Sequence, residues 1–213
     1  MRILPFGDSA TGWSACSGRH GQLPWLRDCR FIRDRLPPVH VLFVCTGNIC
    51  RSPTAERLAT AYSAEHGIPD FTASSAGTHA VIGHPIHPDA AVVLEKLGGD
   101  SSDFAARQLK PKIVSAADLI LTMTREHRDI VLEAAPRQLS RTFTLTEAAR
   151  LASMEGVETL ADLAALRAHL GANDTADIHD PIGQSPEAFE AIGAQIAELL
   201  PPILEVCRRS IRA

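Results

Sequence analysis

The chain has 213 residues, of which 45% are hydrophobic and 22% charged, and it carries a net charge of −4 at pH 7. These values are typical of a soluble globular protein with a sizeable core. The negative net charge excludes the strongly basic class of nucleic-acid and anionic-membrane binders. No apolar run is long enough to cross a bilayer, and Gly7-Asp8 breaks the apolar stretch that a secretory signal requires. Composition therefore predicts a cytoplasmic protein without a membrane or nucleic-acid partner.

The cysteines are odd in number and irregular in spacing, unlike the framework of a secreted disulfide-rich protein. They stand at Cys16, Cys29, Cys45, Cys50 and Cys207. In a reducing compartment a cysteine is buried, metal-bound or catalytic, and burial is the default. We therefore assign chemistry to a cysteine only where its neighbours require it.

Residues 1–38 differ from the rest of the chain, because they contain Gly, Ser, Trp, Arg and Pro without clear periodicity and end in Leu36-Pro37-Pro38. We expect them to form a poorly ordered N-terminal extension, or to reflect an upstream start codon chosen wrongly. The domain itself is predicted to span residues 39–213.

From residue 39 onward, short apolar runs alternate with helical patterns. Strands are predicted at 41–44, 71–75, 119–123 and 141–145. Helices are predicted from Ser52-Pro53, with Ser52 as a possible cap, and over 88–97, from 124 to about 135, over 160–170 and from Ser185-Pro186, the last one interrupted at Pro201-Pro202. This alternation predicts an α/β fold, a single three-layer domain with a four-stranded parallel, doubly wound sheet and helices on both faces.

Cys45 and Arg51 are separated by five residues and lie where the first strand meets the first helix. The spacing alone is weak evidence, since Cys29 and Arg35 share it without a preceding strand or an intervening glycine. Around Cys45, by contrast, Gly47 and Asn48 tolerate the backbone angles that turn successive N–H groups inward. These amides and the helix N-terminus favour an anion and a thiolate, and Arg51 can hold two phosphoryl oxygens. Ser52 can donate to the thiolate or cap the helix.

The segment Cys45-Thr-Gly-Asn-Ile-Cys-Arg-Ser-Pro53 resembles the signature of low-molecular-weight protein tyrosine phosphatases of the bacterial type. The likeness continues in Ser74-Ser-Ala-Gly-Thr78, Ala117-Asp-Leu-Ile-Leu-Thr-Met123 and Asp180-Pro-Ile-Gly183. It implies a phosphomonoesterase without metal or cofactor, in which Cys45 attacks phosphorus and Arg51 and the loop hold the phosphoryl group. The residues assigned to substrate binding in this way are Thr46, Gly47, Asn48, Ile49, Cys50 and Ser52. Family members also use a second cysteine, here Cys50, in a reversible disulfide with the nucleophile, although simple burial of Cys50 stays open.

The resemblance places the general acid in Asp180-Pro181, and a proline after the aspartate favours the extended backbone of a projecting loop. Asp174 and Asp177 are nearby alternatives. The family's aromatic residues after Asp-Pro are replaced by Ile182-Gly183, which weakens the prediction of phosphotyrosine as substrate. Ile49 argues against phosphoarginine, because related arginine phosphatases carry threonine there. The expected partner is a phosphorylated protein or a small aryl phosphate.

Three alternatives complete the prediction. His79, His84 and His87 fit no standard zinc spacing, so we expect them on a loop along the rim of the pocket instead of a metal site. A thioredoxin-coupled arsenate reductase would share the loop, but its relay needs further cysteines and the chain has none between Cys50 and Cys207. A non-catalytic phosphate-binding module would not require Cys45, Arg51 and Asp180 together.

Overall fold

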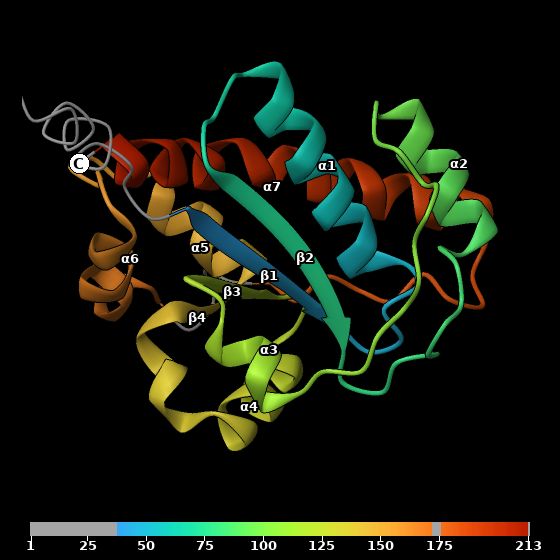
Figure 1. Ribbon diagram of the computed structural model, residues 1–213, viewed down its shortest axis with the longest axis horizontal. Coiled ribbons are helices and arrows are strands. Elements are labelled where there is room, and N and C mark those ends of the chain that lie inside the picture. The colour runs from blue at the N-terminus through green and yellow to red at the C-terminus, as the bar shows by residue number, and fades with distance from the viewer. Residues whose placement is uncertain (1–37, 172–175, 213) are drawn as a thin grey trace, which may run out of the picture. The chain divides into compact units, whose positions relative to one another are not determined.

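The computed structural model describes residues 38–171 and 176–212. Residues 1–37 of the predicted extension, with Cys16 and the Cys29–Arg35 pair, and the alternative acid Asp174 lie outside the described residues. The described part contains a four-stranded parallel sheet in the order β2-β1-β3-β4 (Figure 1). Its strands are β1 (Val39–Cys45), β2 (Phe71–Gly77), β3 (Leu119–Thr122) and β4 (Thr142–Thr144). All four predicted strands are present, so the predicted sheet is confirmed.

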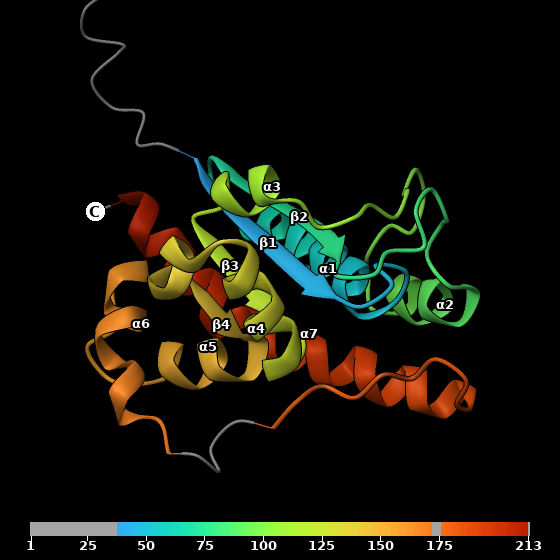
Figure 2. The same ribbon diagram turned by 90° about the horizontal axis from the view of Figure 1, so that it is seen from below.

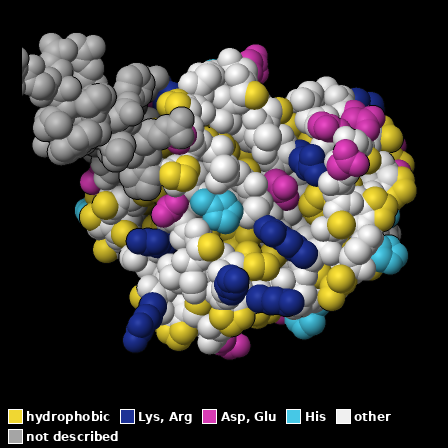
Figure 3. Space-filling model, in the orientation of Figure 1, with side chains coloured by type: hydrophobic (Ala, Val, Ile, Leu, Met, Phe, Trp, Pro, Cys, Tyr) yellow, Lys and Arg dark blue, Asp and Glu magenta, His cyan; other side chains and the backbone are white. Residues whose placement is uncertain are grey.

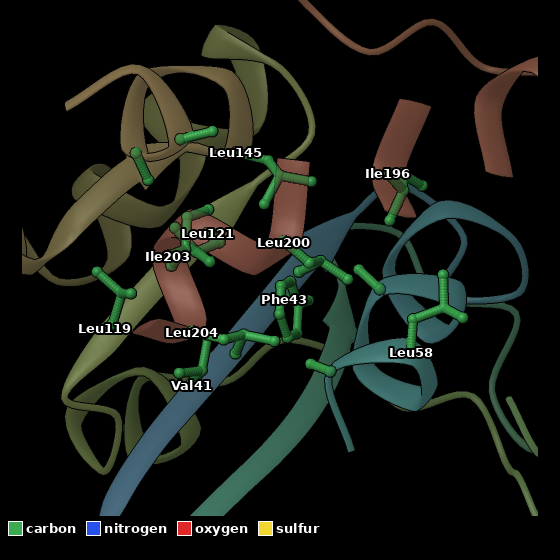
Figure 4. Packing of buried hydrophobic residues seen from close by; sticks show 14 of the residues in the cluster. Val41, Phe43, Leu58, Leu119, Leu121, Leu145, Ile196, Leu200, Ile203 and Leu204 are labelled. Carbon is green, nitrogen blue, oxygen red and sulfur yellow. The ribbon is translucent and has the colours of Figure 1, made fainter. Parts of the chain in front are cut away.

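Side chains alternate between the two faces of β1, as strand geometry requires. Val41 and Phe43 join the larger core cluster, whereas Leu42 and Val44 join a smaller one on the opposite face. Because both faces are covered from Val41 onward, residues 41–45 of the strand form a continuous hydrophobic run. Figure 4 shows Phe43 at the centre of the larger cluster, packed among leucines and isoleucines from both the sheet and the helices.

Helices cover each face. The larger cluster includes residues of α1 (Arg51–Glu65), α2 (Pro88–Lys96), α5 (Leu145–Ala152), α6 (Leu160–Leu166) and α7 (Pro186–Arg212). The smaller cluster includes Val114 of α3 (Pro111–Ser115) and Val131 of α4 (Arg125–Ala134). The two groups of helices lie on opposite sides of the sheet (Figure 2). The prediction of a three-layer α/β domain is therefore confirmed.

The predicted bounds of the fourth strand are wrong. The fourth strand does not reach Leu145, because Thr144 ends it and begins α5, a helix that was not predicted. The hydroxyl of Thr144 accepts a hydrogen bond from the Glu147 amide, and the Glu147 carboxylate accepts one from the Thr144 amide. This reciprocal capping box, Thr144-x-x-Glu147, is a sequence signal for a helix start that competes with the strand pattern.

The predicted interruption at Pro201-Pro202 is also wrong, since α7 runs without a break from Pro186 to Arg212. Two adjacent prolines remove two helical N–H donors, which is unfavourable. They lie beside Leu200, Ile203 and Leu204, which are buried against the sheet. We attribute the continuity of α7 to this packing, which favours the helical conformation over a kink.

The order β2-β1-β3 places a topological switch point between β1 and β3. Loops at the carboxyl ends of these two strands form the crevice in which open α/β sheets bind ligands. The segment after Cys45 lies at this edge. On the face shown in Figure 3, Asp and Glu side chains gather at the end that carries α2, whereas Lys and Arg side chains lie around α3.

Candidate active site

The loop after β1, residues 45–50, is fastened to the segment that follows β2. The carbonyl oxygens of Cys45, Thr46, Gly47 and Ile49 accept hydrogen bonds of 2.7–3.0 Å from amides of residues 78, 79, 81 and 87. The C=O and N–H of one trans peptide group point in opposite directions. With these carbonyls turned outward, the amides of residues 46, 47, 48 and 50 face the interior of the loop. This orientation of the amides is the one that the anion nest requires, and the nest itself stays a prediction.

The approach of β2 to this loop depends on Gly77. A Cβ atom added there would lie 2.4 Å from the carbonyl oxygen of Thr46. Any larger residue would therefore push the strand end away from the loop.

The predicted left-handed backbone of the loop belongs to Asn48 alone, with φ of 54°. Gly47 does not share this conformation, because its φ lies outside the left-handed region. Gly47 instead borders the pocket, where an added Cβ would contact Ile49 Cγ1 at 3.4 Å and Val81 Cγ2 at 3.6 Å. Asparagine adopts this conformation more readily than most residues, and here the hydrogen bonds of its buried amide hold it in place.

The Asn48 amide is fully buried and holds the loop behind the nucleophile. Its Oδ1 accepts a hydrogen bond from the Arg107 amide at 2.9 Å, and this fixes the orientation of the group. Its Nδ2 then donates to the hydroxyls of Ser52, at 3.0 Å, and Ser75, at 2.7 Å. Asn48 therefore shapes the loop through its side chain, which does not line the pocket described below.

These donors leave the protons of both hydroxyls available for two further hydrogen bonds. Because Ser52 accepts from Asn48, its own proton is free for Cys45 Sγ, which is 2.9 Å from Ser52 Oγ. Likewise Ser75 donates to Glu56 Oε2 at 2.5 Å. Burial raises the pKa of Glu56, and the hydrogen bond from Ser75 opposes this rise. Helix α1 begins at Arg51 without a side-chain cap, so the capping role considered for Ser52 is wrong and its hydroxyl serves the thiol.

Arg51 links the loop to the segment that carries the predicted acid. Its Nη1 donates to the carbonyl oxygen of Ile178 at 2.9 Å, and its Nη2 forms an ion pair with Asp180. Ile178 is fully buried, and its amide donates to the carbonyl oxygen of Met123 after β3 at 2.9 Å. Within the described residues, Nε of Arg51 is buried without a hydrogen-bond partner. The guanidinium is thus anchored on one side and retains a donor for an anion.

Of the described acids in this segment, the structure brings Asp180 to Arg51 and directs Asp177 elsewhere. Asp177 Oδ1 accepts a hydrogen bond from the Arg125 amide at 2.9 Å and forms an ion pair with the Arg125 side chain. Asp180 Oδ1 accepts from the Ile182 amide at 3.2 Å, and its side chain is 43% exposed. Pro181 is buried beside it. Only Asp180 of the two borders the pocket described next.

The pocket has a volume of about 240 Å³ and lies at the carboxyl end of β1. Its walls combine the three predicted catalytic residues with apolar side chains at the mouth. They are Cys45, Thr46, Gly47, Ile49, Cys50, Arg51, His79, Val81, Asp180 and Ile182. Four of the six predicted substrate-binding residues line it, whereas Asn48 and Ser52 lie behind the loop. Cys45 itself is 2% exposed.

Comparisons with known proteins place this arrangement in a family. Residues 40–212 match the family model of the low molecular weight phosphotyrosine protein phosphatase. The chain belongs to this family. It is 35% identical over 106 residues to the low molecular weight protein-tyrosine-phosphatase Ptp of Acinetobacter johnsonii, an alignment that covers 50% of this chain and 71% of that protein.

Two further comparisons extend over more of the chain. The protein-arginine-phosphatase of Geobacillus stearothermophilus is 29% identical over 168 residues, which cover 79% of this chain and 95% of that protein. The crystal structure of the low molecular weight protein tyrosine phosphatase from T. tengcongensis superposes with a TM-score of 0.63 at 32% identity, and covers 78% of this chain and 98% of that one. The predicted family, fold and enzyme class, a phosphatase, are confirmed, and the arsenate reductase alternative is not favoured.

The loop after β1, residues 45–50, is called the phosphatase loop from here on. Its two cysteines differ in their surroundings. Burial raises the pKa of the Cys50 thiol to about 12, with the neighbouring Cys45 and Asp180 adding to the rise. Cys50 therefore remains a neutral thiol at physiological pH, which argues against it as the nucleophile. Cys45, Cys50 and Cys207 are all free and buried.

The predicted histidine loop reaches the pocket at one residue only. His79 lines the pocket, whereas His87 precedes α2 and stacks on Phe189 with ring centroids 5.0 Å apart. Across residues 38–171 and 176–212, no three His, Cys, Asp or Glu side chains gather closely enough to hold a metal ion. None of the described helices combines the length and apolar composition that crossing a bilayer requires.

Sequence reasoning missed Val81 and His127. Val81 borders the pocket through the loop that follows β2. His127 belongs to α4 and reaches Thr46, the residue after the nucleophile, with 2.8 Å between its Nε2 and Thr46 Oγ1. A signal for His127 was its place four residues after Met123, at the carboxyl end of the strand next to β1, where ligand sites of open sheets form.

Proposed function

We propose that this phosphatase hydrolyses phosphate monoesters through a cysteinyl-phosphate intermediate, and that its substrate is phosphotyrosine in proteins. The observation that carries the proposal is the convergence of the Cys45 thiol, the Arg51 guanidinium and the Asp180 carboxyl group on one pocket. The predicted roles of these residues are nucleophile, phosphoryl clamp and general acid.

In the first step, Cys45 Sγ attacks phosphorus, and an S–P bond forms as the bond from phosphorus to the ester oxygen breaks. The hydroxyl of Ser52 and the inward amides stabilise the thiolate before the attack. The Nε and Nη2 groups of Arg51 hold two equatorial oxygens, which suits the planar fork of a guanidinium. Asp180, in its protonated form, gives its proton to the departing ester oxygen.

In the second step, water attacks the phosphorus of the cysteinyl-phosphate. Asp180, now a carboxylate, takes a proton from this water, the S–P bond breaks, and inorganic phosphate leaves. Arg51 Nη2 contacts Asp180. A bound phosphoryl group would compete with the carboxylate for that donor.

The mouth of the pocket supports an aromatic phosphate ester. Val81 and Ile182 are 38% and 44% exposed, and Ile49 of the loop lines the same pocket. An aryl ring would bury part of this apolar surface, at about 25 cal/mol per Å². The only tyrosine of the chain, Tyr62, lies on α1, so no tyrosine stacks on the substrate. Aliphatic contact would replace ring stacking.

The proposal includes a redox response of the loop. Oxidation of the Cys45 thiolate by a peroxide would give a sulfenic acid, and the Cys50 thiol would then condense with it to form a disulfide and water. A thiol reductant would be the partner that restores Cys45. The free, buried state of both cysteines and the neutral thiol of Cys50 fit a reducing, cytoplasmic setting.

A substrate panel without added metal tests the proposal. We expect turnover of p-nitrophenyl phosphate and of phosphotyrosine peptides, and much slower turnover of phosphoserine and phosphoarginine. Cys45→Ser should abolish turnover yet bind inorganic phosphate. Cys207→Ser makes the same atom exchange at a buried position in α7 and serves as the control. Normal activity of Cys45→Ser would refute the assignment of the nucleophile, and preference for phosphoarginine would refute the assignment of the substrate.

A further inference from the structure

His127 contacts the loop after β1 at Thr46 and is 5% exposed. Its two ring nitrogens contact two threonines. Nε2 is 2.8 Å from Thr46 Oγ1, and Nδ1 is 2.8 Å from Thr124 Oγ1. The Thr124 hydroxyl also accepts a hydrogen bond from the His127 amide at 3.2 Å, which caps α4. The imidazole is therefore a rigid bridge between the start of α4 and the phosphatase loop.

The imidazole makes these contacts in its neutral form. Burial and the nearby positive charge of Arg51 lower the pKa of His127 to about 4, against a smaller opposing effect of Asp180 and Asp177. A neutral imidazole has one N–H donor and one acceptor nitrogen. In either tautomer Nε2 forms a hydrogen bond with the Thr46 hydroxyl: it donates when it carries the proton and accepts when it does not. His127 is thus suited to fix a hydroxyl and unsuited to exchange protons near neutral pH.

The Thr46 hydroxyl in turn contacts Arg51. Nη2 of Arg51 donates to Thr46 Oγ1 at 3.5 Å, and the same nitrogen contacts Asp180. The guanidinium therefore has three supports: the Ile178 carbonyl at Nη1, and Thr46 and Asp180 at Nη2. When a phosphoryl group displaces Asp180 from Nη2, Ile178 and Thr46 are the supports that remain.

We propose that His127 is a positioning residue of the phosphatase: it fixes the Thr46 hydroxyl, and Thr46 sets the plane of the Arg51 guanidinium for the phosphoryl group. This inference rests on the proposed role of Arg51. His127 itself does not touch the reacting atoms, and its effect on catalysis passes through Thr46. The alternative is a purely structural role, in which His127 only helps to cap α4 and to pack it against its neighbours.

Two substitutions separate the two roles of the ring. The amide of glutamine occupies the place of Nε2 and can still bond Thr46, whereas the shorter amide of asparagine occupies the place of Nδ1 and bonds Thr124. We expect His127→Asn to raise the Kd for inorganic phosphate and the KM for p-nitrophenyl phosphate about fivefold, the range for loss of one neutral hydrogen bond. His127→Gln should restore both to within about twofold. Thermal unfolding of the two variants provides the measure of the structural effect.

A double-mutant cycle completes the test. Thr46→Val removes the hydroxyl, so adding His127→Asn to it should cause no further loss of phosphate affinity. Equal losses for His127→Asn and His127→Gln, or additive losses with Thr46→Val, would overturn the positioning role. Phosphate binding by calorimetry does not require turnover. A wild-type protein that binds phosphate without hydrolysing esters would refute the proposed function and leave this test intact.

Discussion

Replacing Asp180 by asparagine should move catalysis and anion binding in opposite directions. The carboxylate is paired with Arg51 Nη2 at the pocket, so it occupies a donor that the phosphoryl group needs and adds a negative charge beside a dianion. Asparagine keeps the size of the side chain and removes the charge and the acid. We therefore expect weaker catalysis and tighter binding of inorganic phosphate in the same variant.

The geometry sets the size of both effects. Two unit charges about 5 Å apart repel by about 3 kcal/mol at an effective dielectric constant of 20, and by less than 1 kcal/mol in water. Because the Asp180 side chain is 43% exposed, solvent screening reduces the higher figure, and we take about 1.4 kcal/mol. This corresponds to about tenfold tighter phosphate binding. Loss of a general acid lowers kcat by about 10²–10⁴ for esters with poor leaving groups.

Calorimetry with inorganic phosphate and steady-state kinetics with aryl phosphates of graded leaving-group pKa measure the two effects. Asp177→Asn is the matched control, because Asp177 binds the Arg125 amide away from the pocket. It should change phosphate affinity and leaving-group dependence little. Weaker phosphate binding by Asp180→Asn, or an equal loss of kcat for good and poor leaving groups, would contradict the reasoning.

Three further predictions concern the stability of the domain that carries the site. Asn48→Ala should lower the free energy of unfolding by about 3 kcal/mol in chemical denaturation, because it leaves buried partners unpaired and places alanine at positive φ; a loss below 1 kcal/mol would contradict this. The pKa of His127 is about 4 in the folded state and 6.5 in the unfolded state, so the unfolded state binds the proton first as the pH falls. The free energy of unfolding should therefore drop by about 3 kcal/mol between pH 7 and pH 4, and His127→Gln should lack this drop. Parallel pH profiles of stability for the two proteins would show that the pKa of His127 is not lowered. Deletion of residues 1–37 should leave melting temperature and kcat/KM nearly unchanged, and an inactive truncation would show that the domain needs them.

The fold and the loop could be predicted because their signals are local. Buried parallel strands are continuous apolar runs, and β1 and β3 were found in this way. The loop combines a strand end, turn-forming residues and a helix start within a few positions, so its place in the fold follows from the sequence. The missed helix α5 had an equally local signal in Thr144-x-x-Glu147, which the strand pattern of the preceding residues obscured.

The rest of the site depends on contacts between distant segments. Whether Asp177 or Asp180 reaches Arg51 depends on Ile178, which is fully buried, donates to the Met123 carbonyl and accepts from Arg51. The order of these aspartates along the chain does not by itself determine which of them reaches Arg51. His127 meets Thr46 across a separation of 81 residues, and only the parallel order of β1 and β3 brings them together.

The same dependence on distant contacts explains why the spacing of Cys29 and Arg35 does not indicate a phosphatase loop, whereas the equal spacing of Cys45 and Arg51 does. The strained residue of the phosphatase loop is Asn48, whose positive φ is stabilised by Ser75, 27 residues away, and by the Arg107 amide, 59 residues away. The corresponding position after Cys29 is Ile32. A β-branched side chain disfavours that backbone conformation and offers no amide to such partners. The five-residue spacing allows a thiol and a guanidinium to lie close together. The buried side-chain amide of Asn48 between them is what holds the loop in a shape that can enclose an anion.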